Sequence, residues 1–184
     1  MKKRLTNMVL AVLLFAGCSS MQTVVEKQPD ADFSSYRTWD WYPQDPSAKK
    51  DPSADLPEDL RNYIRSTVEA SLAGRGLEHS GFSPDLYVDF QVTVQDVDSP
   101  QVINEYYGQD YYSDVQFNLP TVQTTYGSGF EQGALVLMMF DAKSKQIVWR
   151  GIASTEVNSQ GPRKEARERI DKAVEKLTDK LPKK

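Results

Sequence analysis

The stretch from Leu86 to Gln95 alternates apolar and polar residues at every position, and few folds accommodate such a pattern. Its apolar members are Leu86, Val88, Phe90, Val92 and Val94, and its polar members are Tyr87, Asp89, Gln91, Thr93 and Gln95. Because successive side chains of a strand point to opposite faces, a period of two predicts a half-buried strand in an antiparallel sheet. This segment therefore needs partner strands elsewhere in the chain.

Those partners are predicted toward the C-terminus. Ala134–Phe140 is a continuous apolar run, and Ile147–Val157 follows it after the polar segment Asp141–Gln146, which is suited to a turn. Two strands joined by so short a connection predict a β-hairpin. A further strand is predicted at Tyr36–Tyr42, with its two tryptophans on the inward face.

Two segments carry the period of an amphipathic helix. The first begins at Pro57, ends at Gly74 or Gly76, and has an apolar stripe at every fourth residue, namely Leu60, Ile64, Val68 and Leu72. The second follows Pro162 and runs to about Leu181. The order strand, helix, strand, hairpin, helix predicts one α+β domain over residues 33–182, with an antiparallel-dominated sheet and both helices packed on one face.

The N-terminus has the pattern of an export signal. Lys2–Arg4 is a basic head, and Met8–Ala16 is an apolar run that is followed by Gly17 and Cys18. A bilayer core needs about 20 apolar residues, so this run is too short to span one. Residues 1–17 are therefore predicted to be a signal peptide that is removed.

The segment that ends at Cys18, the only cysteine, resembles a bacterial lipoprotein signal with its lipobox. That resemblance implies acyl chains (palmitate among them) on Cys18, which becomes the mature N-terminus and is held at the membrane by its lipid. It also implies, from Ser19 at the next position, the periplasmic face of the outer membrane if the organism is Gram-negative. Residues 18–32 are predicted to be the lipidated cysteine and a flexible tether with a reach of about 40–50 Å.

The charge of the mature chain limits its partners. Loss of residues 1–17 leaves 19 of the 22 basic residues against 26 acidic ones, a net charge of −7. Nucleic acids and anionic lipid headgroups are bound through basic patches. We therefore expect no nucleic-acid partner, and contact with the membrane through the acyl chains alone.

The chain offers little for catalysis or metal binding. His79 is the only histidine, and a triad drawn with Ser80 or Ser83 and Asp85 would rest on adjacency in sequence, whereas triads assemble from separated elements. Zinc and copper sites draw on several His or Cys ligands. The expectation is that the protein is not an enzyme and holds no metal and no cofactor.

One patch is unusual in composition. Tyr106, Tyr107, Tyr111 and Tyr112 lie within seven residues, inside the poorly periodic segment 96–132. Tyrosines combine an apolar ring with a hydroxyl group, which suits protein interfaces and sugar stacking. Either these tyrosines form a binding patch, or they cover the edge of a further strand.

Several segments together resemble a known family. They are Tyr36–Trp41, Leu72–Gly76, Pro84–Val88, Gly133–Asp141 and Val148–Ala153, in that order. The chain from about residue 33 to residue 182 is similar to bacterial lipoproteins of the domain-of-unknown-function family 4136. The resemblance implies a location and a fold, but no established activity and no catalytic residues.

Three functions are consistent with these observations. The first is a membrane-anchored envelope lipoprotein that serves as a non-enzymatic binding or accessory module for another periplasmic or outer-membrane component. The second is a binder of glycans or small ligands that uses the loop from Tyr106 to Tyr112. The third is an envelope enzyme of an unrecognised type.

Overall fold

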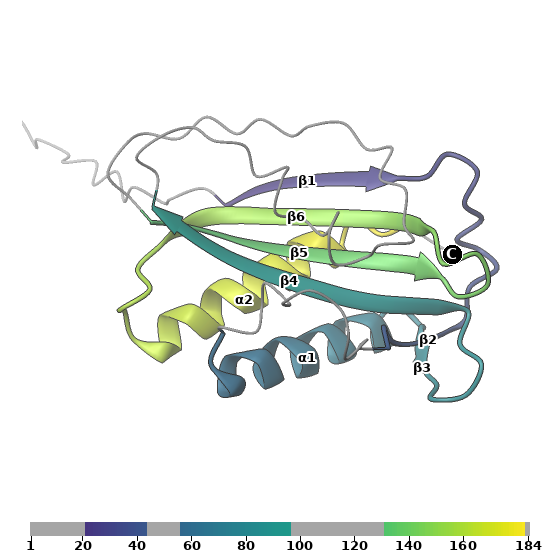
Figure 1. Cartoon of the computed structure of the whole chain (residues 1–184), viewed down its shortest axis with the longest axis horizontal. Helices are drawn as coiled ribbons and strands as arrows, with labels where there is room; N and C mark the ends of the chain where they lie inside the picture. Colours follow the sequence, from purple (N-terminus) through teal and green to yellow (C-terminus); the bar gives the residue numbers. More distant parts are fainter. Residues whose placement is uncertain (1–20, 44–55, 97–130, 183–184) are drawn as a thin grey trace, which may run out of the picture.

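The computed structural model describes residues 21–43, 56–96 and 131–182. These form a sheet with two helices on one of its faces (Figure 1). The elements in chain order are β1 (Gln22–Lys27), β2 (Thr38–Trp41), α1 (Glu58–Ala73), β3 (Glu78–His79), β4 (Leu86–Asp96), β5 (Glu131–Asp141), β6 (Ile147–Val157) and α2 (Arg163–Thr178). The predicted α+β class is confirmed.

The centre of the sheet is antiparallel, and the strands lie in the order β1-β6-β5-β4-β2-β3. β4 pairs with β5 from Leu86 opposite Asp141 to Asp96 opposite Glu131, and β5 pairs with β6 through the predicted hairpin. β2 runs parallel to β4 because α1 carries the chain across between them, and β3 runs parallel to β2. The sheet is therefore mostly antiparallel, as predicted, with a parallel edge.

Both helices bury the apolar stripes that the sequence indicates. In α1 the buried residues are Leu60, Ile64, Val68 and Leu72, and beneath them Trp39 and Trp149 are each 1% exposed. The helices are also joined to each other, by hydroxyl contacts between Ser71 and Thr178 (2.7 Å) and from Tyr63 to Asp171 (2.9 Å). α1, α2 and one face of the sheet thus enclose the main core.

The predicted flexible tether is wrong over much of its length. Residues 22–27 form the edge strand β1, which pairs antiparallel with β6 from Gln22 opposite Ser154 to Lys27 opposite Trp149. Glu26 forms a buried ion pair with Arg150 (2.5 Å). The segment has no clear period of its own, so its strand conformation depends on a partner more than a hundred residues away. Cys18, Ser19 and Ser20 lie outside the described residues.

The sheet face that points away from the helices is also buried. A second apolar cluster lies on it, made of Ala134, Val136, Met138, Phe140 and Ile152. We predicted that Asp89 and Gln91 would face solvent, yet they are 5% and 1% exposed. The alternation in β4, taken alone, indicates that one face of the strand is exposed to solvent. The neighbouring strand β5 is apolar on both faces, so a second core lies beside the polar side chains of β4. Conversely, Val94 was expected to point inward and is 48% exposed.

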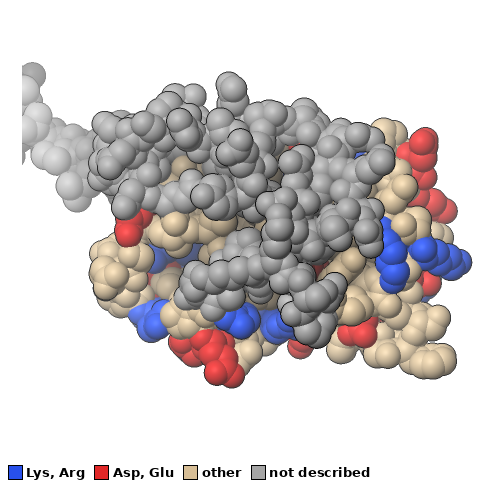
Figure 2. Space-filling view, in the orientation of Figure 1, with Lys and Arg blue, Asp and Glu red and all other residues tan. Residues whose placement is uncertain are grey.

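The outer surface of the helix layer is charged and mixed in sign, and red and blue side chains are interspersed over the described residues in Figure 2. Exposed ion pairs join Asp59 of α1 to Arg163 and Arg167 of α2, at 3.8 and 3.9 Å. Within the described ranges, neither helix has the length and apolarity that crossing a bilayer requires.

Candidate functional site

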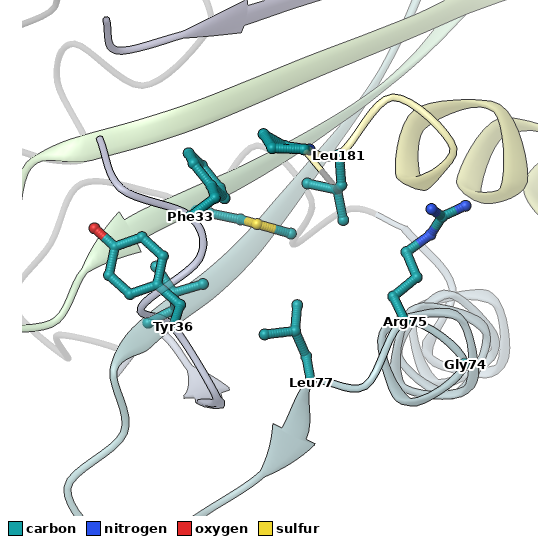
Figure 3. A pocket seen from close by; sticks show the side chains of 9 residues that line it. Phe33, Tyr36, Gly74, Arg75, Leu77 and Leu181 are labelled. Atoms are coloured by element: carbon teal, nitrogen blue, oxygen red, sulfur yellow. The ribbon is translucent and has the colours of Figure 1, made fainter. Parts of the chain in front are cut away.

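An apolar cavity of about 260 Å³ lies where the C-terminal ends of both helices meet the sheet. Its lining is drawn from separate segments and comprises Phe33, Tyr36, Gly74, Arg75, Leu77, Leu86, Met139, Leu181 and Pro182. In Figure 3, Phe33 and Tyr36 approach from one side and Arg75 from the other, with Leu181 and Leu77 between them. A pocket with this composition favours an apolar ligand or an apolar side chain.

The ends of the helices shape this cavity. The chain leaves α1 through Gly76, whose φ of 73° lies in the left-handed region that glycine adopts without strain. This turn brings the Leu77 N–H back to the Leu72 carbonyl oxygen (3.1 Å) and points the chain toward β3. Arg75 forms an ion pair with Asp179, which follows α2, so the two helix ends are tied together at the rim of the cavity.

Tyr36 separates the apolar cavity from a polar hollow of about 410 Å³. Its ring packs edge-on against Phe33 at 5.5 Å, while its hydroxyl donates to Asp141 Oδ2 at 3.2 Å. Burial, together with the charge of Asp141, raises the pKa of Tyr36 to about 12. Asp32 and Asp85 also line the hollow, so several carboxylates lie around it.

The carboxylates of the hollow are held by hydrogen bonds to their ionised forms. Asp85 Oδ2 accepts from the backbone N–H groups of Arg37 (2.8 Å) and Thr38 (3.0 Å), and these bonds lower the pKa of Asp85. Burial raises the pKa of Asp141, but hydrogen bonds from Ser144, Tyr36 and the Lys143 N–H outweigh it, and the net pKa is lowered. Asp85, Asp141 and Tyr36 therefore each keep one protonation state around neutral pH, whereas a general acid or base needs a pKa near the working pH.

The triad drawn from adjacent residues does not assemble. His79 Nε2 lies 3.0 Å from Asp40 Oδ1, and its ring packs on Trp39 at 4.9 Å between centroids. Ser80 Oγ donates to the Phe82 carbonyl oxygen (2.9 Å), and Asp85 is occupied by the start of β2. Asp85 instead anchors the Arg37–Thr38 backbone at the start of β2.

The other predicted site residues fall elsewhere. Tyr106, Tyr107, Tyr111 and Tyr112 lie outside the described residues, as does Cys18. Within the described ranges, His, Cys, Asp and Glu side chains form no group of three or more able to hold a metal ion. The cavity was missed by the sequence reasoning because its lining comes from both helix ends, both ends of the Phe33–Tyr36 segment and two strands, and only the folded chain brings these together.

A protein-family model for a domain of unknown function, DUF4136, matches residues 23–183. The chain belongs to the DUF4136 family. The match begins inside β1, ten residues before the domain boundary at residue 33 that the sequence suggested, in agreement with the place of β1 in the sheet. No functionally curated protein matches the chain.

Several solved structures are similar to the chain. A PDZ domain protein from Parabacteroides distasonis superposes with a TM-score of 0.53 at 13% identity, over 90% of this chain but only 38% of that one. A DUF4136 family protein from Bacteroides thetaiotaomicron superposes with a TM-score of 0.49 at 14% identity, over 85% of this chain and 95% of the other. A PelC dodecamer from Paraburkholderia phytofirmans gives 0.44 at 11% identity, over 86% and 98%. The first of these has a TM-score above 0.5, and at 13% identity its likeness concerns the fold alone.

Proposed function

We propose that this DUF4136 protein is a membrane-anchored envelope lipoprotein, acylated on Cys18, whose domain binds another envelope component and catalyses no reaction. In a Gram-negative cell, Ser19 favours the outer membrane with the domain in the periplasm. The observation that carries the proposal is the short apolar run with its basic head and small-residue exit, which ends at the only cysteine, directly before the family domain. One acyl chain binds a bilayer marginally, and several bind it stably.

Binding without catalysis is supported by the state of the polar groups at the candidate site. Asp85 and Asp141 have lowered pKa values and Tyr36 has a raised one, so around neutral pH they serve as fixed acceptors and a fixed donor. His79 is paired with Asp40 and packs against the Trp39 ring. Asp85, Asp141 and Tyr36 can therefore orient a partner or hold the fold without exchanging protons around neutral pH.

Metabolic labelling tests the anchor. Cells that express the full chain are grown with an alkyne-bearing palmitate analogue, and the protein is examined for the label. We expect label on the wild type and on Ser19→Ala, and none on Cys18→Ser. Unlabelled wild-type protein would contradict the proposal.

A photo-crosslinking experiment tests the partner. A photoreactive residue is placed at Tyr106, Tyr107, Tyr111 or Tyr112, and a matched set is placed on exposed helix positions such as Lys164. One dominant protein adduct from the tyrosine set alone identifies the component that the lipoprotein serves. If peptidoglycan fragments instead change the Tyr and Trp fluorescence of the purified chain, the glycan-binding alternative replaces a protein partner.

The cavity favours a second candidate function, the binding of a small apolar ligand that carries a carboxylate. Its volume lies between that of a benzene-sized void and that of a drug-sized pocket. Arg75 is the charged residue among its lining, and its side chain is 30% exposed. A ligand carboxylate in the cavity would bind the guanidinium in place of Asp179.

Decanoate and decanol serve as probes for this candidate. Binding to the full chain is followed through the NMR signal of the Met139 methyl group, which borders the cavity. We expect decanoate to bind more tightly than decanol, Arg75→Gln to abolish that difference, and Leu181→Trp to fill the cavity and block both. Equal binding of the two probes to the wild type would remove the carboxylate from the proposal, and no binding would reject the site.

A further inference from the structure

β1 is joined to the rest of the domain along its whole length and on both faces. All six of its residues pair with β6, and Gln28 N–H continues the ladder to the Val148 carbonyl oxygen at 3.0 Å. On the helix face, Lys180 Nζ donates to Thr23 Oγ1 at 2.6 Å, and on the opposite face Glu26 is ion-paired with Arg150 while both side chains are nearly buried. Met21, just before β1, is 8% exposed and packs in the main core. The packed part of the domain therefore includes residue 21.

β1 begins at the end of the sheet where β4 and β6 end. Gln22 lies opposite Ser154, three residues before β6 ends at Val157, and Val157 in turn lies opposite Glu131 at the start of β5. Glu131 lies opposite Asp96, where β4 ends. The starts of β1 and β5 and the ends of β4 and β6 thus share one end of the sheet, at the left of Figure 1.

Only a short length of chain separates this end of the sheet from Cys18. Four residue steps separate Cys18 from Gln22, and an extended chain covers at most about 14 Å in that distance. The 40–50 Å reach of a free tether is lost because residues 22–27 are part of the sheet. In contrast, the eleven residues of β5 cover about 34 Å from Glu131 to Asp141.

We propose that the sheet end where β1 begins faces the bilayer, and that the opposite end, which carries the cavity of Tyr36 and Arg75, faces away from the membrane. This inference rests on the acylation of Cys18 under the proposed function and adds an orientation to it. The β5–β6 turn around Lys143 and the exposed Phe82 (88%), four residues before β4, belong to that outward end. A partner that binds at the outward end contacts the domain about 30 Å or more from the sheet end that faces the bilayer.

Energy transfer to labelled lipids tests the orientation. The acylated full chain, bound to phospholipid vesicles with acceptor-labelled headgroups, carries a donor dye at Gln160→Cys near the proposed membrane end or at Lys143→Cys at the outward end. Both positions are exposed, and the acyl chains occupy the only native cysteine, so each label is unique. We expect transfer to be several-fold more efficient from position 160 than from position 143.

A longer tether provides the matched control. About 14 Gly and Ser residues inserted between Ser20 and Met21 restore the reach of a flexible tether, and the difference between the two label positions should then largely disappear. Equal transfer from both positions in vesicle-bound protein without the insertion would overturn the orientation while leaving the anchor intact. Failure of the palmitate-labelled chain to sediment with vesicles would instead overturn the proposed function, and the orientation with it.

Discussion

The indole of Trp149 lies across Gly151, two residues further along the same strand. A Cβ at Gly151 would come within 2.5 Å of Trp149 Cη2 and within 3.0 Å of Leu177 Cδ2 on α2. Trp149 and Leu177 both belong to the main core, and Trp149 is 1% exposed. The absence of a side chain at position 151 is therefore what lets the tryptophan lie flat on β6 beneath α2. This gives a packing reason for the Val-Trp-Arg-Gly stretch within the family resemblance.

Gly151→Ala is expected to destabilise the domain by about 1–3 kcal/mol, because the added methyl group forces the Trp149 ring and Leu177 apart in a close-packed core. Urea unfolding followed by tryptophan fluorescence measures the change. Gly81→Ala is the control, since a Cβ there meets nothing within 4 Å, and it should alter stability by no more than about 0.5 kcal/mol. Equal effects of the two substitutions would contradict the packing argument.

Glu26→Ala is expected to cost about 3 kcal/mol or more of unfolding free energy, because it removes the carboxylate that Arg150 contacts at 2.5 Å and leaves a guanidinium buried beside it. Glu168→Ala breaks the exposed pair with Lys164 and should cost at most about 1 kcal/mol. Thermal or urea unfolding compares the two variants. If Glu26→Ala leaves the unfolding free energy unchanged, β1 adds little to the stability of the fold. The proposed orientation of the domain would then lose support.

Asp85→Asn is expected to lower stability at neutral pH by about 1–2 kcal/mol, because the Arg37 and Thr38 N–H groups lose a charged acceptor. Since the folded pKa of Asp85 lies below its ordinary value of 3.8, its contribution is present above that value and is lost as the pH falls through the folded pKa. The variant should therefore lose less stability than the wild type between neutral and acid pH. Urea midpoints across that range measure this, with exposed Asp30→Asn as a control that follows the wild type.

Tyr36→Phe is expected to flatten the alkaline dependence of stability. The folded pKa of Tyr36, about 12, exceeds its ordinary value of 10.0, so the neutral tyrosine stabilises the fold below pH 10 and this contribution is lost as the pH rises toward 12. The wild type should lose stability over that interval more steeply than the variant. Tyrosinate absorbance of the folded protein should also lose its component near pH 12 in the variant. Superimposable curves for the two proteins would refute the assignment.

The elements that the sequence predicted correctly are those whose pattern is local. The helix α1 is indicated by an apolar residue at every fourth position from Leu60 onward, and its start by Pro57. Both signals lie within or directly beside the helix itself. The hairpin was predicted for the same reason, since Asp141 accepts hydrogen bonds from the Ser144 N–H (2.7 Å) and the Lys143 N–H (3.1 Å) within its own turn. Trp39 was placed in the core from alternation alone, and it is buried.

The candidate site was beyond that reasoning. The residues that the sequence singled out for function were Cys18 and the four tyrosines, and none of them lies among the described residues. The cavity instead joins Phe33, Arg75 and Leu181, none of which the sequence singled out for function. A cavity is a property of the gaps between packed elements, and no single segment encodes it.

The sequence by itself determined the two amphipathic helices, the three long strands and an α+β class, because hydrophobic periods of 3.6 and 2 are set by backbone geometry and can be read within a few turns or residues. Only the tertiary structure decided that residues 22–27 are an edge strand, that Asp89 and Gln91 are buried, and that β2 pairs in parallel with β4. Each of these depends on a partner distant in the chain. Burial and strand pairing are properties of two surfaces that meet, and one of the two is missing from any local stretch of sequence.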